Sequence, residues 1–487
     1  MSKPLRVIKF GGTSVGSASR IANVIEIIRA ASLDSYVVVV VSAMCGVTNS
    51  LIEAAAQSEA GNSQAAAAIF EALRIRHNAV VGALIPSAVE QATLVRGQQS
   101  VFDQGERLSH HAAVSRKMSS AARDSISALG ERLCAPLLAA ALRRSSMASE
   151  AVDATELIVT DAHHGNADPI MDRTRWRCQA RLIPLLQQGI IPVVTGFIGA
   201  TEEGIPTTLG RGGSDYSATI LGAALNANEV VIWTDVDGML TADPRLVAEA
   251  RTIAEISYQE ATVLASFGAK VLHPKTLRPV MQSGIPLWIR NSFAPEQPGT
   301  KITLTGTVDC GEVKALSAIG EASVITLRGP ALMYARDVIG RALAAAASVR
   351  VDVLFTFKSS AQGDINLVVM SQLAKRTVVA LRQEFVHELA VDSAGLIEVD
   401  STVAIVTAVG RNMIALSGTV ERIFAALVRE HINLVAIAKG TSECSISFVI
   451  AQKDLSAMLR TAHQEFRLGR TDFAANSNPQ CLVEDAA

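Results

Sequence analysis

An apolar run that ends in a glycine turn opens the chain and limits what it can fold into. Leu5–Ile8 has the composition of a buried strand, the segment Lys9–Ser14 carries two glycines, and a helical stretch follows. Glycines without a Cβ let backbone N–H groups approach an anion, and a helix N-terminus adds unpaired donors and partial positive charge. Lys9 adds a full charge at the same point. The pattern favours a phosphate cradle, although such a turn is also common as a plain connection.

A second glycine-rich turn strengthens the phosphate interpretation. The segment Thr207–Asp215 contains three glycines and leads into the helix-like Tyr216–Leu225. Two anion cradles indicate two anionic groups that the protein brings together. The turn is neither a Walker loop nor a dinucleotide fingerprint, because Gly-x-x-x-x-Gly-Lys-Ser/Thr and Gly-x-Gly-x-x-Gly after a strand do not occur.

Two further blocks, Trp233–Arg245 and Phe267–Pro274, follow the second turn. In this order, the four blocks closely resemble aspartate kinase of the amino-acid-kinase superfamily. Segments 42–49, 105–109, 195–199, 290–293 and 298–300 are also similar to that family. The resemblance implies an α/β fold, a mostly parallel sheet with helices on both faces. It also implies phosphoryl transfer from ATP to the side-chain carboxylate of L-aspartate, giving 4-phospho-L-aspartate, the first step of the aspartate-family amino acid pathway.

The composition favours a cytoplasmic, multidomain protein whose partners are small molecules. A length of 487 residues suggests about three domains, and 44 basic against 46 acidic residues give no global attraction to nucleic acid or to an acidic membrane. The six cysteines lie far apart, without ligand spacing, and fit reduced thiols. No long apolar region precedes the first glycine turn, and the longest aliphatic run, Val37–Val41, has the length of a strand. We therefore expect no signal peptide and no membrane partner.

Strand-like and helical patterns alternate over the first part of the chain. Apolar runs at Arg6–Phe10, Tyr36–Ser42, Ile190–Phe197 and Glu229–Thr234 predict a mostly parallel sheet, and residues 51–150 read as helices. Ligands of such sheets bind at the carboxyl ends of strands, which is where each glycine turn falls. A turn-rich segment before residue 300 predicts the end of a catalytic domain that spans residues 1–300.

The rest of the chain contains an internal repeat with an offset of 81 residues. Arg341 matches Arg422, and the strand-like 365–369 matches 446–450. Each copy reads strand, helix, strand, strand. In the resembled family this region is a pair of βαββαβ ACT modules that bind regulatory amino acids and pair in dimers.

The resemblance places the first module at residues 306–390, with a strand shared with the second, and the second module at 391–475. Residues 476–487 predict a flexible tail. The partners implied are an amino-acid effector at the modules and further copies of the chain, in a homodimer or homotetramer. Bulky residues at 328–335 replace a glycine-rich turn that the family usually has in the first module, whereas the second keeps Gly418. Weak or absent inhibition by lysine is therefore expected.

A carboxylate acceptor is already ionised at neutral pH, so phosphoryl transfer to it needs positioning and charge neutralisation rather than a general base. By resemblance, Lys9 contacts the transferring phosphoryl group. Asp215 would orient Lys9 and, directly or through water, the Mg²⁺ that accompanies ATP. Its alternative role is that of an acidic residue at the start of a helix.

The amino-acid substrate needs an anion for its α-amino group and a guanidinium fork for its α-carboxylate. By family analogy, Glu106 and Arg211 supply these. The groups expected around the side-chain carboxylate are Ser42, Thr48, Gly213 and Ser214. Taken in isolation, Glu106 could equally form a surface salt bridge, and the hydroxyls could cap helices.

The resemblance assigns the nucleotide to Lys9, Gly11, Gly12, Ser14, Thr234, Asp235, Leu240, Arg245 and Lys270. Arg245 and Lys270 are the expected phosphate contacts. Leu240 stands where the family commonly carries a tyrosine, which alters a contact on the adenine side. His273 and Cys45 lack a partner in sequence reach and are interpreted as structural.

Two alternatives stay open. One is a kinase of the same superfamily that acts on another acceptor, such as acetylglutamate or a nucleotide. Glu106 argues against it, because an acylated amine needs no anion. The other is a catalytically silent amino-acid sensor, which the joint presence of Lys9, Arg211, Asp215 and Lys270 disfavours.

Overall fold

The computed structural model describes residues 3–268, 271–307, 313–329, 337–358, 364–391, 396–411, 413, 417–439 and 444–469. The chain forms two compact units. The first comprises the described residues of Met1–Met239, Thr252–Tyr258 and Lys270–Thr307, and the second those of Leu240–Arg251, Gln259–Ala269 and Val308–Ala487. Several features named above lie outside the described residues, namely Lys270, residues 330–336, Cys310, Cys481 and the tail 476–487.

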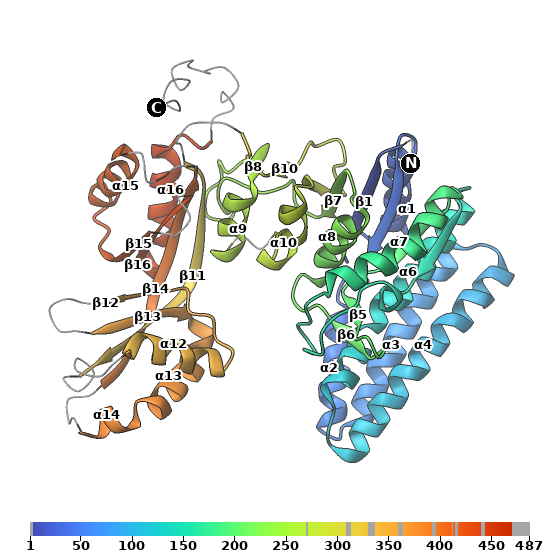
Figure 1. The fold of residues 1–487 in the computed structure, drawn as a ribbon, viewed down its shortest axis with the longest axis horizontal. Helices are drawn as coiled ribbons and strands as arrows, with labels where there is room; N and C mark the ends of the chain where they lie inside the picture. Colours follow the sequence, from blue (N-terminus) through green and yellow to red (C-terminus); the bar gives the residue numbers. More distant parts are fainter. Residues whose placement is uncertain are drawn as a thin grey trace. The chain divides into compact units, whose positions relative to one another are not determined.

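An eight-stranded sheet forms the centre of the first unit (Figure 1). Its order is β3-β4-β2-β1-β7-β9-β10-β8, and every pair is parallel except β9 with β10. The strands are β1 Leu5–Phe10, β2 Tyr36–Val41, β3 Ser149–Val152, β4 Ile191–Thr195, β7 Glu229–Thr234, β8 Glu255–Ser257, β9 Leu287–Asn291 and β10 Thr300–Thr303. A separate antiparallel pair consists of β5 Ile198–Ala200 and β6 Pro206–Thr208. The prediction of a mostly parallel sheet is confirmed.

Helices connect these strands. They are α1 Ala18–Ser32, α2 Val47–Glu59, α3 Ser63–Leu84, α4 Ala88–Ser115, α5 Ser120–Ser127, α6 Leu129–Arg144, α7 Met171–Gln187, α8 Gly213–Leu225 and α10 Pro274–Ser283, with a 3-10 turn at Ala154–Glu156. Ser17, Ser87 and Ser119 cap α1, α4 and α5, because each hydroxyl accepts the N–H three residues on. Ser120–Arg144 has the length and apolar composition of a membrane span, but 83% of its most apolar window is buried inside the protein, as in a core helix.

The alternation of side chains along β1 decides where Lys9 lies. Ile8 and Phe10 pack in a core that also contains Ile21 of α1 and Leu133 of α6. Successive strand residues face opposite sides of a sheet, so Lys9 lies on the other face, where α8 packs against β1. Lys9 at the end of β1 thereby contacts α8, the helix that begins after the second glycine turn.

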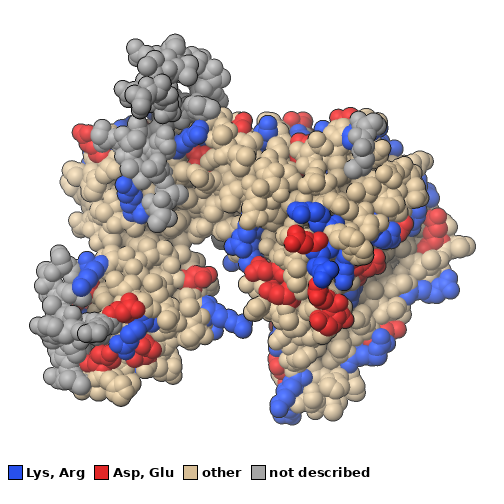
Figure 2. Space-filling view, in the orientation of Figure 1, with Lys and Arg blue, Asp and Glu red and all other residues tan. Residues whose placement is uncertain are grey.

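Charged side chains are mixed on the surface of the first unit. On the face drawn in Figure 2, lysines and arginines lie among aspartates and glutamates rather than apart from them. This mixture agrees with a formal net charge of -2 for the whole chain.

The second unit is built on a six-stranded antiparallel sheet in the order β12-β13-β11-β14-β16-β15. The strands are β11 Val313–Arg328, β12 Phe355–Lys358, β13 Ile365–Met370, β14 Leu396–Gly410, β15 Leu434–Lys439 and β16 Ser445–Ala451. The helices are α9 Tyr258–Ser266, most of which belongs to this unit, α12 Val338–Ser348, α13 Ser371–Glu384, α14 Val386–Val391, α15 Ser417–Arg429 and α16 Leu455–Glu465, with a 3-10 turn at Gln452–Asp454. The two long strands β11 and β14 pair along most of their length.

The repeat of 81 residues is visible in side-chain contacts. Arg341 of α12 lies 2.7 Å from Glu384, and its guanidinium stands 4.5 Å from the centre of the Phe385 ring. Arg422 of α15 makes the matching contacts, 3.3 Å to Glu465 and 4.5 Å to the Phe466 ring. Each partner lies 81 positions after its counterpart. Equivalent arginines therefore make equivalent contacts in both copies of the repeat.

Two segments of the expected catalytic domain group with the second unit instead, residues 240–251 and the described residues of 259–269. Residues 240–251 leave the first unit after β7, and Ala242 and Val247 are buried in the core beneath α16. Thr241 Oγ1 lies 3.0 Å from His463 Nε2, and Arg251 Nε donates to the Leu468 carbonyl at 2.7 Å. The segment that follows Asp237 is thus held by the repeat-containing unit.

We expect two phenylalanines of the second unit to differ sharply in their contribution to its stability. Phe448 of β16 is fully buried, whereas Phe424 of α15 is 39% exposed. Phe448→Ala should lower the local free energy of unfolding by about 3–5 kcal/mol through loss of burial and an unfilled cavity. Phe424→Ala, the matched control, should cost about 1 kcal/mol. Hydrogen exchange measured on peptides from β14 and β16 gives both values, and equal losses would contradict this packing.

Candidate active site

A cavity of about 580 Å³ lies at the carboxyl ends of strands in the first unit. Its walls come from the ends of β1 and β2, from α2, α5 and α6, and from the turn that opens α8. Of the residues predicted from the sequence, it is lined by Lys9, Ser42, Thr48, Arg211, Gly213, Ser214 and Asp215. This is the edge at which ligands bind to mostly parallel sheets.

Lys9 and Asp215 form an ion pair in this cavity. Lys9 is only 7% exposed, and its Nζ contacts Asp215 Oδ1 from the first turn of α8. Lys9 precedes the first glycine turn and Asp215 follows the second, so the ion pair links the two turns. A buried ammonium that is held in place can neutralise an incoming anion without reorganising.

The first glycine turn is packed so closely that it admits no side chain. A Cβ on Gly12 would lie 2.7 Å from the Ala43 carbonyl oxygen. Cys45 N–H donates to the Gly12 carbonyl at 3.0 Å, which ties this turn to the loop after β2. Arg76 of α3 holds both loops, because it donates to the carbonyls of Cys45 at 2.8 Å and Gly16 at 3.3 Å. These hydrogen bonds therefore hold the backbone of the first glycine turn in position.

Glu131 of α6 lines the same cavity and was not predicted from the sequence. It is 1% exposed, Oε1 accepts the Ala43 N–H at 3.0 Å, and Oε2 is buried without a partner among the described residues. Burial raises the pKa of Glu131 to about 8, although the Ala43 N–H and the Lys9 ammonium act to lower it. Burial thus favours the neutral carboxyl group, and one of its oxygens lies in the wall of the cavity without a partner among the described residues.

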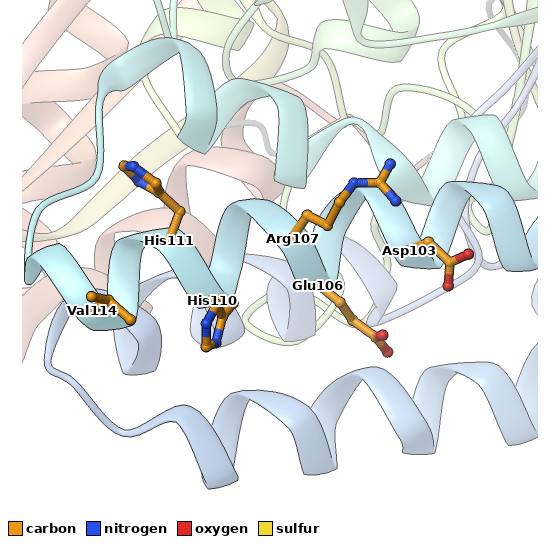
Figure 3. A pocket seen from close by; sticks show the side chains of 6 residues that line it. All are labelled: Asp103, Glu106, Arg107, His110, His111 and Val114. Atoms are coloured by element: carbon orange, nitrogen blue, oxygen red, sulfur yellow. The ribbon is translucent and has the colours of Figure 1, made fainter.

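Glu106 lies elsewhere. It is on α4 and pairs with Arg74 of α3. Figure 3 shows it along a groove of about 600 Å³ on α4, whose lining residues are Asp103, Glu106, Arg107, His110, His111 and Val114. The structure does not bring Glu106 to the cavity that contains Lys9. The sequence did carry a signal for Glu131, because Gly-Glu-Arg-Leu occurs at both 105–108 and 130–133.

The second glycine turn presents Arg211 at the mouth of the cavity. Gly210 and Gly212 have φ values of +80° and +70°, and a Cβ on Gly213 would lie 2.5 Å from Phe197 Cδ2. These positions require glycine. Arg211 is exposed and forms no ion pair with any described residue, which leaves its guanidinium available to an anionic ligand.

Several of the predicted nucleotide-binding residues lie at the neighbouring ends of β1 and β7. Ser14 Oγ lies 2.8 Å from Ser292 Oγ, Ser292 N–H donates to the Thr234 carbonyl at 2.9 Å, and Thr234 Oγ1 donates to Asp235 at 3.2 Å. Gly11 N–H donates to the Trp233 carbonyl at 3.1 Å. The ends of β1 and β7 therefore lie side by side, as their parallel pairing requires.

Two of the remaining nucleotide candidates lie in the second unit, and one lies outside the described residues. Leu240 and Arg245 belong to the second unit, where Arg245 pairs with Asp243 at 2.9 Å between Nε and Oδ1. Lys270 lies outside the described residues. His273 caps α10, since its Nδ1 accepts the Lys275 N–H at 3.3 Å, which agrees with the structural role expected for it.

The cavity contains further charged groups that the sequence did not reveal. Arg123 and Asp124 of α5 line it, and Arg123 is paired with Glu59 at 2.7 Å. Neither residue belongs to a recognisable motif. Among the described residues, no three His, Cys, Asp or Glu side chains lie close enough together to hold a metal ion.

Comparison with protein-family models gives two matches. The model of the amino acid kinase family matches residues 4–291, and an ACT domain model matches residues 406–466. Curated relatives include bifunctional aspartokinase/homoserine dehydrogenase 1 of Zea mays, 31% identical over 96% of this chain and 51% of the relative. The corresponding protein of Haemophilus influenzae is 31% identical over 94% of this chain and 56% of its own length. The chain spans about half the length of these curated relatives.

Solved structures agree with the family models. E. coli aspartokinase III in complex with aspartate and ADP has a TM-score of 0.79, at 28% identity over 95% of this chain and 99% of that one. The same enzyme with lysine and aspartate has a TM-score of 0.77 at 28% identity, over 95% and 99% of the two chains. Because the family model covers more than half of its length, the chain belongs to the amino acid kinase family.

Proposed function

We propose that the chain transfers the γ-phosphoryl group of ATP to the side-chain carboxylate of L-aspartate, giving 4-phospho-L-aspartate and ADP. The observation that carries the proposal is one cavity in which a phosphate cradle around Lys9 meets an unpaired, buried carboxyl group on Glu131. Relatives named aspartokinase and the similarity to aspartokinase III with aspartate and ADP support it.

Lys9 and the amides of the first glycine turn act on the phosphoryl group. The acceptor carboxylate and the γ-phosphate are both anions, so the barrier is electrostatic. Lys9 neutralises charge on the transferring group, and Asp215 holds the ammonium in position through the ion pair. No protein base is required, because the acceptor is ionised at neutral pH.

Glu131 and Arg211 form the amino-acid clamp. We assign the α-amino contact to Glu131 in place of Glu106, because only Glu131 lines the cavity and has an unpaired oxygen. Arg211 takes the α-carboxylate as a bidentate fork. The groups near the side-chain carboxylate are Ser42, Thr48, Gly213 and Ser214. An acceptor with an acylated amine would leave Glu131 without a cationic partner, which disfavours acetylglutamate.

ATP lies across the ends of β1 and β7 in this proposal. We assign its contacts in the first unit to Gly11, Gly12, Ser14, Thr234 and Asp235. Mg²⁺ commonly keeps several waters and binds substrate phosphates with one or two carboxylates. In this proposal the nucleotide carries most of the ion's ligands, and Asp215 is the nearby carboxylate, directly or through water.

The second unit is the site proposed for regulation and assembly. Its match to an ACT domain model and its two copies of one arginine contact support binding of an amino-acid effector. We also propose that the chain forms a homodimer or homotetramer through these modules and acts in the cytoplasm.

Trapping with hydroxylamine tests the reaction. An acyl phosphate should be captured as the hydroxamate only when both ATP and L-aspartate are supplied. Lys9→Met should lower kcat by about 100-fold or more, because the transferring group loses its main positive partner. The matched control Lys3→Met removes an exposed lysine whose Nζ donates to the Leu33 carbonyl, and should keep wild-type activity. ADP release without any hydroxamate would rule the reaction out.

The clamp can be tested with a matched pair of glutamates. Glu131→Gln should raise the KM for aspartate by about 10–100-fold while the KM for ATP stays within about twofold, because only aspartate loses a charged hydrogen-bond partner. Glu106→Gln, outside the cavity, should change neither value. A large aspartate effect from Glu106→Gln and none from Glu131→Gln would reverse the assignment.

A further inference from the structure

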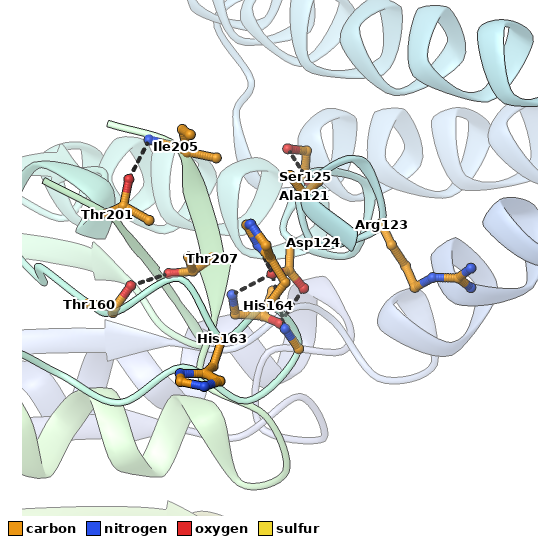
Figure 4. Close-up of polar contacts among 12 residues, drawn as sticks. Ala121, Arg123, Asp124, Ser125, Thr160, His163, His164, Thr201, Ile205 and Thr207 are labelled. Carbon is orange, nitrogen blue, oxygen red and sulfur yellow. Dashed lines mark hydrogen bonds and ion pairs between the residues drawn. The ribbon is translucent and has the colours of Figure 1, made fainter. Parts of the chain in front are cut away.

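Four hydrogen bonds converge on the buried carboxylate of Asp124. Oδ2 lies 2.8 Å from His164 Nδ1 and accepts the N–H groups of Gly165 at 3.1 Å and Thr208 at 3.2 Å. Oδ1 accepts the Thr208 hydroxyl at 2.7 Å. Figure 4 shows these contacts meeting at Asp124 on α5. Asp124 is 4% exposed.

These donors come from two separate walls of the cavity. One is the loop 161–170, which contains His164 and Gly165. The other is the end of β6, where Thr208 begins the turn that carries Arg211. The two walls also touch directly, because Ala167 N–H donates to the Thr208 carbonyl at 2.9 Å. Asp124 is therefore a shared anchor for both.

The backbone between Thr208 and Arg211 is held by further contacts besides those with Asp124. Leu209 N–H donates to the Phe197 carbonyl at 2.9 Å, and a Cβ on Gly210 would lie 2.6 Å from Asn166 Oδ1 of the loop. The loop is held on its far side by Lys275 of α10, whose Nζ contacts Asn166 and Asp168, each at 3.0 Å. The path from Thr208 to Arg211 is thus fixed by its contacts with the loop that Asp124 holds.

Asp124 lines the cavity, but both of its oxygens already have partners from the protein. A carboxylate is an acceptor only, and these partners are donors. In a cavity that takes anions, a free carboxylate would repel the substrate. Here the four donors compensate its charge, so its effect on a substrate has to pass through the groups that it holds.

We propose that Asp124 is a positioning residue for amino-acid binding: through Thr208 and the His164 loop it sets the geometry in which Arg211 meets the α-carboxylate. The inference rests on the proposed function for its substrate. Within the described part of the chain, the hydrogen bonds of Asp124, His164 and Thr208 involve neither Lys9 nor a nucleotide candidate, so the effect should be confined to the amino acid.

The isosteric change Asp124→Asn tests the proposal without opening a cavity. The amide oxygen of Asn can keep the three donors that Oδ2 now accepts, as neutral bonds, but the amide nitrogen cannot accept the Thr208 hydroxyl as Oδ1 does. We expect the KM for aspartate to rise about tenfold with the KM for ATP within twofold. Asp172→Asn, at an exposed aspartate of α7, is the matched control. Thr208→Val should raise the aspartate KM more than Thr208→Ser, which keeps the hydroxyl.

A double-mutant cycle separates positioning from general damage. If Asp124 acts through Arg211, the aspartate KM of the Asp124→Asn, Arg211→Lys double variant should be well below the product of the two single effects. Effects that multiply, or equal increases in both KM values, would overturn the proposal. Hydrogen exchange gives a readout without catalysis, and Asp124→Asn should accelerate exchange in residues 161–170 and 207–213 and leave β1 unchanged.

The two proposals fail separately. Wild-type protein that traps no aspartyl hydroxamate would refute the proposed reaction, while faster exchange confined to the two walls would still support the anchoring role of Asp124. Wild-type activity together with unchanged exchange in Asp124→Asn would refute the anchoring role alone.

Discussion

The ion pair between Lys9 and Asp215 is the contact on which the rest of the site depends. β1 lies between β2 and β7 in the sheet, and Lys9 at its end reaches the first turn of α8. Because a glycine turn adjoins each partner, the pair fixes the two turns relative to each other. Loss of either partner would leave a buried, uncompensated charge, which is strongly unfavourable. The fold therefore presents an ammonium that is already desolvated and oriented before a phosphate arrives.

Lys9 is buried in an ion pair with Asp215, whereas burial of Glu131 favours its neutral form. Burial raises its pKa to about 8, so folding takes up a proton on this group, and the stability it contributes is lost as pH rises from the ordinary carboxyl range toward 8. A ligand ammonium reverses this effect, because it favours the ionised form. In the proposed function, the ammonium of an amino-acid ligand offsets the free-energy cost of ionising the buried carboxyl group.

The sequence predicted the parts of the structure that local patterns determine. Strand ends with glycine turns placed Lys9, Arg211 and Asp215 around one cavity, and the repeat of 81 residues identified matched contacts of Arg341 and Arg422. The sequence could not show which of the two Gly-Glu-Arg-Leu segments carries the glutamate of the cavity, because tertiary packing decides which glutamate is buried. Gly130 packs against Ala43 and so brings the second copy beneath the β2 loop. Nor did local pattern reveal that residues 240–251 pack in the second unit.

Proton release on aspartate binding tests the central claim, that a neutral, buried Glu131 receives the substrate amine. Calorimetric titration with ADP present, in buffers of different ionisation enthalpy, counts the protons released. Because burial raises the pKa of Glu131 to about 8, aspartate binding should release protons at pH 7 and release fewer at pH 9. Glu131→Gln should abolish the release. Binding of aspartate at pH 7 with no proton release, or with release unchanged in that variant, would contradict the account.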